Sequence, residues 1–192
     1  MYAAAMSEPH PLVLQLRFTR SEFLRAIKGI PDADASRRIL PMNCVAWNVG
    51  HLAWQEQRYF LTIGQGRTLL PEIAERFRYG APASQPALAD VLAAWHAVTA
   101  EVDPWLDTLD VESLLSRPGV RGRPGPTTLG NRLQRTIYHY WFHTGENMAI
   151  RQIMGHRRLP QFVGDIDGAA PYRPEAPLGA TLPDRQRRSV IV

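Results

Sequence analysis

Proline and glycine residues divide this chain of 192 residues into four long stretches, each with the spacing of apolar residues that is typical of a helix. The stretches lie at about Leu12–Lys28, Cys44–Ile63, Ala87–Leu109 and Thr128–Met154. Helices with an apolar face bury those faces against one another. We therefore predict an all-α fold in which four long helices form a bundle.

Local signals indicate where these helices begin and end. Asn43 is a candidate N-cap for the second helix and Thr127 for the fourth. Pro104 is expected to kink or break the third helix near its end. The long connection after the second helix should contain a short helix at Glu72–Phe77, whereas the prolines and glycines of Arg117–Pro126 exclude regular structure.

The composition changes near Gly168. The residues that follow are rich in proline and end in a cluster of arginines: Pro171, Pro174, Pro177, Pro183, Arg185, Arg187 and Arg188. We expect the bundle to occupy residues 1–168. Residues 169–192 are expected to form an irregular Pro/Arg-rich tail that is extended or partly disordered.

Charge and composition narrow the classes of function. The formal net charge is +4, but the positive charges are scattered among acidic residues, so no nucleic-acid-binding face is expected. No apolar run reaches about 18 residues, and the first residues lack the features of a secretory signal, so no membrane role is expected either. The one cysteine, Cys44, excludes an internal disulfide and fits a cytoplasmic location. A small molecule is the expected partner.

Three histidines carry the most specific chemical signal. His139 and His143 lie four residues apart in the fourth helix, so their imidazoles share one helix face and can point at one ion. His51 lies far upstream in the second helix. Three histidines from two packed helices would form a metal site that leaves a coordination position open for water or substrate.

Other interpretations of these residues stay open. Two histidines four residues apart also occur as a structural pair, and His51 could be a core residue bonded to its neighbours. Glu146, three residues after His143, has four candidate roles: a fourth metal ligand, an acceptor for an imidazole N–H, a general base or a surface acid. Tyr140 stands where the helix of zinc proteases carries its glutamate, which argues against that class of enzyme.

Two arginines are candidates for substrate binding. Arg58 follows His51 by about two turns, and Arg135 precedes His139 by about one turn. An arginine beside a metal pocket can hold a carboxylate or a thiolate. The alternative for each is an ordinary salt bridge on the surface of a helix.

The neighbours of His51 are also informative. Gly50 would allow another helix to approach closely, and Asn48 could orient the imidazole of His51. Cys44 is excluded as a ligand to the same ion, because seven residues of helix separate it from His51 by about 10.5 Å. His96 lies off the apolar stripe of the third helix and is expected at the surface.

The motifs NVGHLAW at 48–54 and HYWFHTGE at 139–146 together resemble those of the DinB-like superfamily. The resemblance extends over about residues 12–167. It implies an up-down-down-up four-helix bundle, often dimeric, with a divalent metal held by one histidine of the second helix and two of the fourth. By resemblance these roles fall on His51, His139 and His143.

Members of this superfamily with known activities are mostly thiol-dependent, among them mycothiol-dependent maleylpyruvate isomerase and bacillithiol transferases. The resemblance thus implies a divalent metal, mycothiol or another low-molecular-weight thiol as cosubstrate, and a homodimer. Three imidazole ligands suit zinc, nickel or iron, and copper as well, so the ligands do not select the metal. Our leading hypothesis is a metal-dependent enzyme of the transferase or isomerase type in which Arg58, Arg135 and Glu146 serve catalysis. The alternative is a non-catalytic metal-binding stress or sensor protein.

Overall fold

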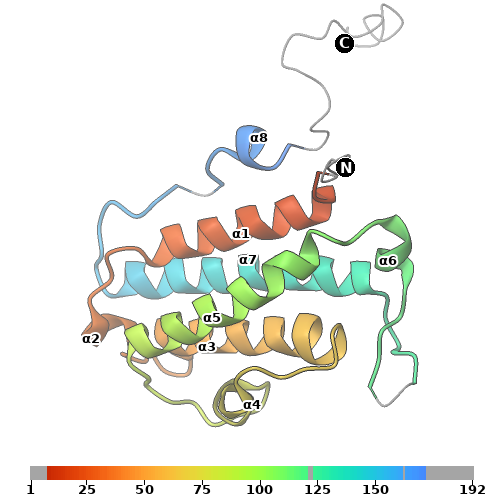
Figure 1. The fold of residues 1–192 in the computed structure, drawn as a ribbon. Coiled ribbons are helices and arrows are strands. Elements are labelled where there is room, and N and C mark those ends of the chain that lie inside the picture. Colours follow the sequence, from red (N-terminus) through yellow and green to blue (C-terminus); the bar gives the residue numbers. More distant parts are fainter. Residues whose placement is uncertain (1–7, 121–122, 162, 172–192) are drawn as a thin grey trace, which may run out of the picture.

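The structure is a computed structural model that describes residues 8–120, 123–161 and 163–171, and in these residues every regular element is a helix (Figure 1). The elements are α1 (Pro11–Ile27), α2 (Asp32–Ala35), α3 (Val45–Glu56), η1 (Gln57–Ile63), α4 (Pro71–Phe77), α5 (Leu88–Leu106), α6 (Val111–Leu115), α7 (Leu129–Ile153) and α8 (Ile166–Ala169). The all-α prediction is confirmed. The four predicted long helices correspond to α1, α3 with η1, α5 and α7.

The long helices pack in pairs (Figure 1). Helix α1 lies along α7, and α3 lies along α5. Helix α3 also contacts α7, which brings the two histidine-bearing segments of the chain together. The short helix α4, predicted at Glu72–Phe77, packs against α3, and α6 packs against α7.

The helix ends differ from the prediction by a few residues. Cys44, not Asn43, caps α3, because its Sγ accepts a hydrogen bond from the N–H of Trp47 at 3.4 Å. Thr128, not Thr127, caps α7. Pro104 lies inside α5, which ends only two residues later, so the helix stops in the turn that contains the proline.

The second predicted helix is not α-helical throughout, because η1 is a π-helix. Its wider turn is visible in the hydrogen bond that the N–H of Gly64 donates to the carbonyl of Tyr59, five residues earlier, at 3.1 Å. At its start, the Gln57 side chain donates to the carbonyl of Leu70 at 2.9 Å and accepts from the N–H of the same residue at 2.7 Å. These bonds fasten the loop before α4 to η1.

A buried polar network crosses the apolar core and joins all four long helices. The Arg20 guanidinium donates two hydrogen bonds to the Glu56 carboxylate and one to Asp103 at 2.6 Å. The Tyr140 hydroxyl donates to Glu56 at 2.6 Å and accepts from the indole N–H of Trp95 at 2.6 Å. Burial alone would lower the pKa of the Arg20 guanidinium. The negative charge and the hydrogen bonds of Glu56 outweigh this effect of burial, so the pKa is raised. Burial and Glu56 likewise raise the pKa of Tyr140.

Beyond α7 the chain returns to α1. The amide of Gln15 donates to the carbonyl of Ala170 at 2.6 Å, and α8 contacts α1. The predicted tail at 169–192 lies, apart from its first three residues, outside the described part of the chain. Within the described part, no helix is both long enough and apolar enough to cross a membrane.

Candidate metal centre

The three histidines singled out in the sequence lie together between α3 and α7. One ring nitrogen from each of His51, His139 and His143 lies within 4.8 Å of the other two. The ring centroid of His51 is 4.9 Å from that of His139 and 5.4 Å from that of His143. The expected convergence is therefore present, and metal binding itself stays a prediction.

His51 is fixed by a backbone carbonyl and by aromatic side chains. Its Nδ1 lies 2.6 Å from the carbonyl oxygen of Phe77. Because a carbonyl only accepts, Nδ1 carries the proton and Nε2 keeps a free lone pair. The ring stacks on Trp47 at 4.9 Å and contacts Trp54 at 5.2 Å. Gly50 was expected to let another helix approach closely, and that helix is α4. A Cβ at Gly50 would lie 2.8 Å from the ring of Phe77, the last residue of α4.

His143 is fixed by a carboxylate. Its Nδ1 donates to Oε2 of Glu146 at 2.7 Å, and the same oxygen accepts from the amide of Asn48 at 2.9 Å. The contacts of Glu146 match the second of its four candidate roles, acceptor for an imidazole N–H. Asn48 does not bond to His51 as suggested from the sequence; it supports His143 through Glu146 instead.

His139 is the least constrained of the three. It is half-buried, whereas His51 and His143 are buried. Its Nε2 lies 3.0 Å from Nε2 of His143, close to the ~3.3 Å that separates two nitrogen ligands of a tetrahedral ion with bonds near 2.0–2.1 Å. Its Nδ1 is buried and has no hydrogen-bond partner among the described residues.

The environment keeps two of the imidazoles neutral. Burial lowers the pKa of His51 to about 4, and the neighbouring His143 acts in the same direction. Burial, His143 and His51 together lower the pKa of His139 to about 3. The neutral imidazole is the form that binds a metal ion, so at neutral pH these nitrogens need not lose a proton first. The donor set therefore fits a divalent ion such as zinc, nickel or iron.

Neither of the two predicted arginines belongs to the histidine cluster. The Arg58 guanidinium lies 5.7 Å from the ring centre of Trp54, which in turn contacts His51. Arg58 and Arg135 line one cavity of about 430 Å³ between η1 and the start of α7. Sequence reasoning missed a third arginine in this cavity, Arg132, and also missed the Phe77 carbonyl that orients His51.

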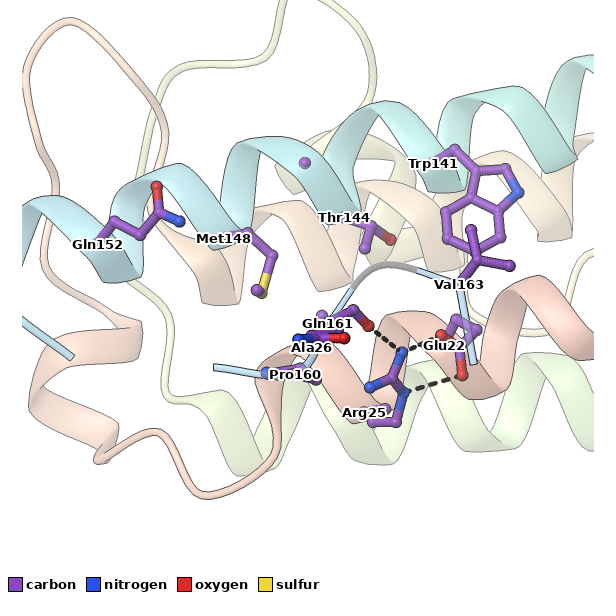
Figure 2. Close-up of a pocket in the computed structure, with 11 residues that line it drawn as sticks. Glu22, Arg25, Ala26, Trp141, Thr144, Met148, Gln152, Pro160, Gln161 and Val163 are labelled. Carbon is purple, nitrogen blue, oxygen red and sulfur yellow. Dashed lines mark hydrogen bonds and ion pairs between the residues drawn. The ribbon is translucent and has the colours of Figure 1, made fainter. Parts of the chain in front are cut away.

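A separate cavity of about 290 Å³ lies between α1 and α7 (Figure 2). Trp141 and Thr144 line it from α7, and an ion pair of Arg25 with Glu22 lines it from α1. Trp141 follows His139 by two residues, about 200° around the helix. This cavity is therefore not the opening of the histidine cluster.

In the described residues the fold is all-helical, and three histidines converge between two of its helices. The protein is therefore a helical protein with a candidate metal centre whose ligands would be imidazole nitrogens. A family model, the DinB superfamily, matches residues 15–146. This match covers more than half of the chain and contains His51, His139 and His143, so the chain belongs to the DinB superfamily. The matched range is shorter than the resemblance seen in the sequence and ends at Glu146. A comparison with curated proteins finds no match.

Proposed function

We propose that His51, His139 and His143 bind one divalent metal ion, zinc, nickel or iron, and that the protein is a metal-dependent enzyme that uses a low-molecular-weight thiol. The reaction is of the transferase or isomerase type, and the thiol is mycothiol or a related compound. The observation that carries this proposal is the convergence of three imidazole nitrogens within 4.8 Å on a member of the DinB superfamily.

The residues around the histidines have distinct parts in this chemistry. A bound divalent ion supplies a positive charge that lowers the pKa of a coordinated thiol, so that the thiolate nucleophile exists near neutral pH. The Phe77 carbonyl and the Glu146 carboxylate hold the Nδ1 protons of His51 and His143, which leaves both Nε2 atoms free. Arg58 and Arg135 hold an anionic group of the substrate in the cavity that they line.

The alternative is a non-catalytic metal-binding stress or sensor protein. Such a protein favours a closed site, and Glu146 is the side chain best placed by sequence to close it. Its Oε2 instead accepts from His143 Nδ1 and from Asn48. Glu146 is therefore engaged with these two side chains and does not close the cluster, which favours an open site and therefore the enzyme.

The test separates metal binding from turnover. Protein purified without a histidine tag is analysed for metal content and then screened for thiol transfer with mycothiol and bacillithiol. We expect about one metal per chain, loss of metal in His51→Ala, His139→Ala and His143→Ala, and loss of activity with a chelator. His96→Ala is the control, because His96 is exposed on α5 and outside the cluster.

Three results would contradict parts of this proposal. A wild-type protein without metal after growth with zinc, nickel and iron would end both the enzyme and the sensor hypotheses. Full thiol transfer by the chelated protein would end the metal-dependent mechanism. One tightly bound metal with no turnover of any thiol would leave the sensor hypothesis.

We also propose a homodimer that forms through an apolar strip on α7. Tyr138, Phe142 and Ile153 lie on this helix and are 68%, 67% and 61% exposed. Large exposed apolar side chains on one helix are typical of an interface. Light scattering should give twice the mass of the chain for the wild type and the monomer mass for Phe142→Glu. A monomeric wild type would contradict the proposal.

Two further proposals concern the direction of the helices and the compartment of the protein. We infer an up-down-down-up bundle from the pairing of α1 with α7 and of α3 with α5, since the long connection between α3 and α5 lets these two helices run in the same direction. We infer a reducing compartment such as the cytoplasm from Cys44, which is buried and unpaired.

A further inference from the structure

Arg132 is a buried cation without an anion. It lies in the first turn of α7 and is 5% exposed. Its Nε donates to the Thr127 hydroxyl at 3.3 Å, and its Nη1 is buried with no hydrogen-bond partner among the described residues. No carboxylate of the described chain forms an ion pair with it. Buried charges are normally paired, so this guanidinium lacks the partner that its position requires.

The core network provides the comparison within the same chain. Arg20 is equally buried, yet its guanidinium binds the carboxylates of Glu56 and Asp103. The pKa of Arg20 is raised as a result, whereas burial and the nearby charge of Arg58 lower the pKa of Arg132. The folded chain thus pairs one of these guanidiniums and leaves the other unpaired.

The surroundings of Arg132 are built to receive a negative group. Arg132 lines the cavity of about 430 Å³ together with Arg58, Arg123 and Arg135, and no acidic residue is among its described lining residues. Tyr59 forms an aromatic wall 5.9 Å from the Arg132 guanidinium. A Cβ at Gly125 would lie 2.5 Å from Nη2 of Arg132 and 2.5 Å from the backbone carbonyl oxygen of Pro118, so the loop before α7 packs closely around the guanidinium and needs glycine there because of the Pro118 backbone.

We propose that this cavity binds the oxyanion of a small molecule, a carboxylate or a phosphate, with Arg132 as the central contact and Arg58 and Arg135 at its rim. A planar guanidinium presents parallel N–H donors that match either oxyanion. The inference rests on the proposed function only in treating this molecule as the substrate. Oxyanion binding itself needs no metal ion.

The test is calorimetric titration of inorganic phosphate and of succinate into the full chain at constant ionic strength, with and without a chelator. We expect saturable binding of at least one of the two, in both conditions. Arg132→Met should weaken it at least tenfold, and so should the double variant Arg58→Gln/Arg135→Gln. The double variant changes only exposed side chains and therefore decides the question if Arg132→Met does not fold.

Arg37→Gln is the matched control, because it removes one exposed positive charge outside the cavity. Absence of saturable binding, unchanged binding in the double variant, or an equal loss in Arg37→Gln would overturn the inference. If only one of the two ligands binds, that ligand shows whether the cavity takes a phosphate or a carboxylate. Oxyanion binding by a protein that takes up no metal would contradict the proposed metal centre but not this inference. Metal uptake without oxyanion binding would overturn this inference, and with it the anion-holding role of Arg58 and Arg135, but not the proposed metal centre.

Discussion

Each histidine of the cluster is held in a different way. His51 donates to a backbone carbonyl, His143 donates to a carboxylate, and His139 has no acceptor for its Nδ1 among the described residues. A backbone acceptor cannot be removed by a side-chain substitution, whereas Glu146 can be changed singly. The cluster therefore has one imidazole held by the backbone, one held by a neighbouring carboxylate and one whose Nδ1 is without a partner among the described residues.

The first prediction concerns Glu146. Glu146→Gln keeps the size of the side chain but removes the negative charge that supports the Nδ1 proton of His143. Substitution of such a partner typically weakens metal affinity about 10–100-fold. Competition with a chromophoric chelator measures the affinity, and Glu75→Gln, at an exposed site on α4, is the control. An unchanged affinity would show that Glu146 does not support the ligand.

The second prediction is the pH dependence of the metal-free protein. The pKa of His51 is about 4 in the folded chain and about 6.5 when unfolded, so the unfolded state binds more protons between these values. The free energy of unfolding should therefore fall as the pH drops below 6.5, by about 2 kcal/mol from His51 alone at pH 4.5. Urea unfolding at pH 7 and pH 4.5 measures the loss.

The control for this pH effect is the same measurement on two variants. His51→Gln has no group that titrates at this position, so its free energy of unfolding should depend less on pH. His96→Gln, at the surface, should behave like the wild type. Equal pH dependence in His51→Gln and the wild type would mean that burial does not keep His51 neutral.

At the scale of elements, the contact between α3 and α4 positions the cluster. Phe77 is the last residue of α4, its ring packs on Gly50 and its carbonyl accepts from His51. Displacement of α4 would therefore move a hydrogen-bond acceptor of the centre as well as a core side chain.

The third prediction follows from this contact. Gly50→Ala places a Cβ 2.8 Å from the Phe77 ring, which must shift, at a cost of about 1–3 kcal/mol in the free energy of unfolding. The shift should also weaken metal binding through His51. Gly145→Ala is the control, because its Cβ meets no atom within 4 Å and alanine favours a helix. Chemical denaturation and metal titration of both variants test the point; equal stability in the two would refute it.

The long helices could be predicted from the sequence, whereas the π-helix and the shortest helices could not. Apolar periodicity located the long helices to within a few residues, since burial of one face leaves a pattern over many turns. The π-helix η1 was missed because seven residues are too few to reveal a wider turn and its apolar residues fit either helix. The four-residue helices α2 and α8 were missed because they are shorter than any periodicity that a sequence can show.

The candidate site was predictable where side chains alone define it. His139 and His143 share a face by spacing, and the approach of α3 to α7 brings His51 to them. The Phe77 carbonyl left no signal, because every residue has a carbonyl. Arg132 left none either, since its sequence neighbourhood does not distinguish a buried arginine from an exposed one.

At the scale of the whole molecule, the buried network holds the four long helices in one arrangement. Arg20 comes from α1, Glu56 from α3, Trp95 and Asp103 from α5, and Tyr140 from α7. Tyr140 follows His139 directly in the chain. The network therefore fixes α7 against α3 one residue away from the candidate metal centre.

The fourth prediction addresses this network. Glu56→Gln leaves the Arg20 guanidinium without its buried partner and should lower the free energy of unfolding by about 3–5 kcal/mol. Tyr140→Phe removes one hydroxyl but keeps the ion pair, so the expected loss is smaller, about 1–3 kcal/mol. Equilibrium denaturation compares the two. A loss in Tyr140→Phe that equals or exceeds the loss in Glu56→Gln would contradict the assignment of the ion pair as the main polar contact of the core.

Helix α7 is continuous from Leu129 to Ile153 and carries both Arg132 and His139, which are seven residues apart. Seven residues are two turns, a rise of about 10.5 Å that no side-chain rearrangement can alter. The backbone of α7 therefore sets a fixed axial separation between the Cα atoms of the proposed oxyanion contact and of the proposed metal ligand. If both proposed sites act on one molecule, that molecule must be long enough to reach from the arginine cavity to the histidine cluster.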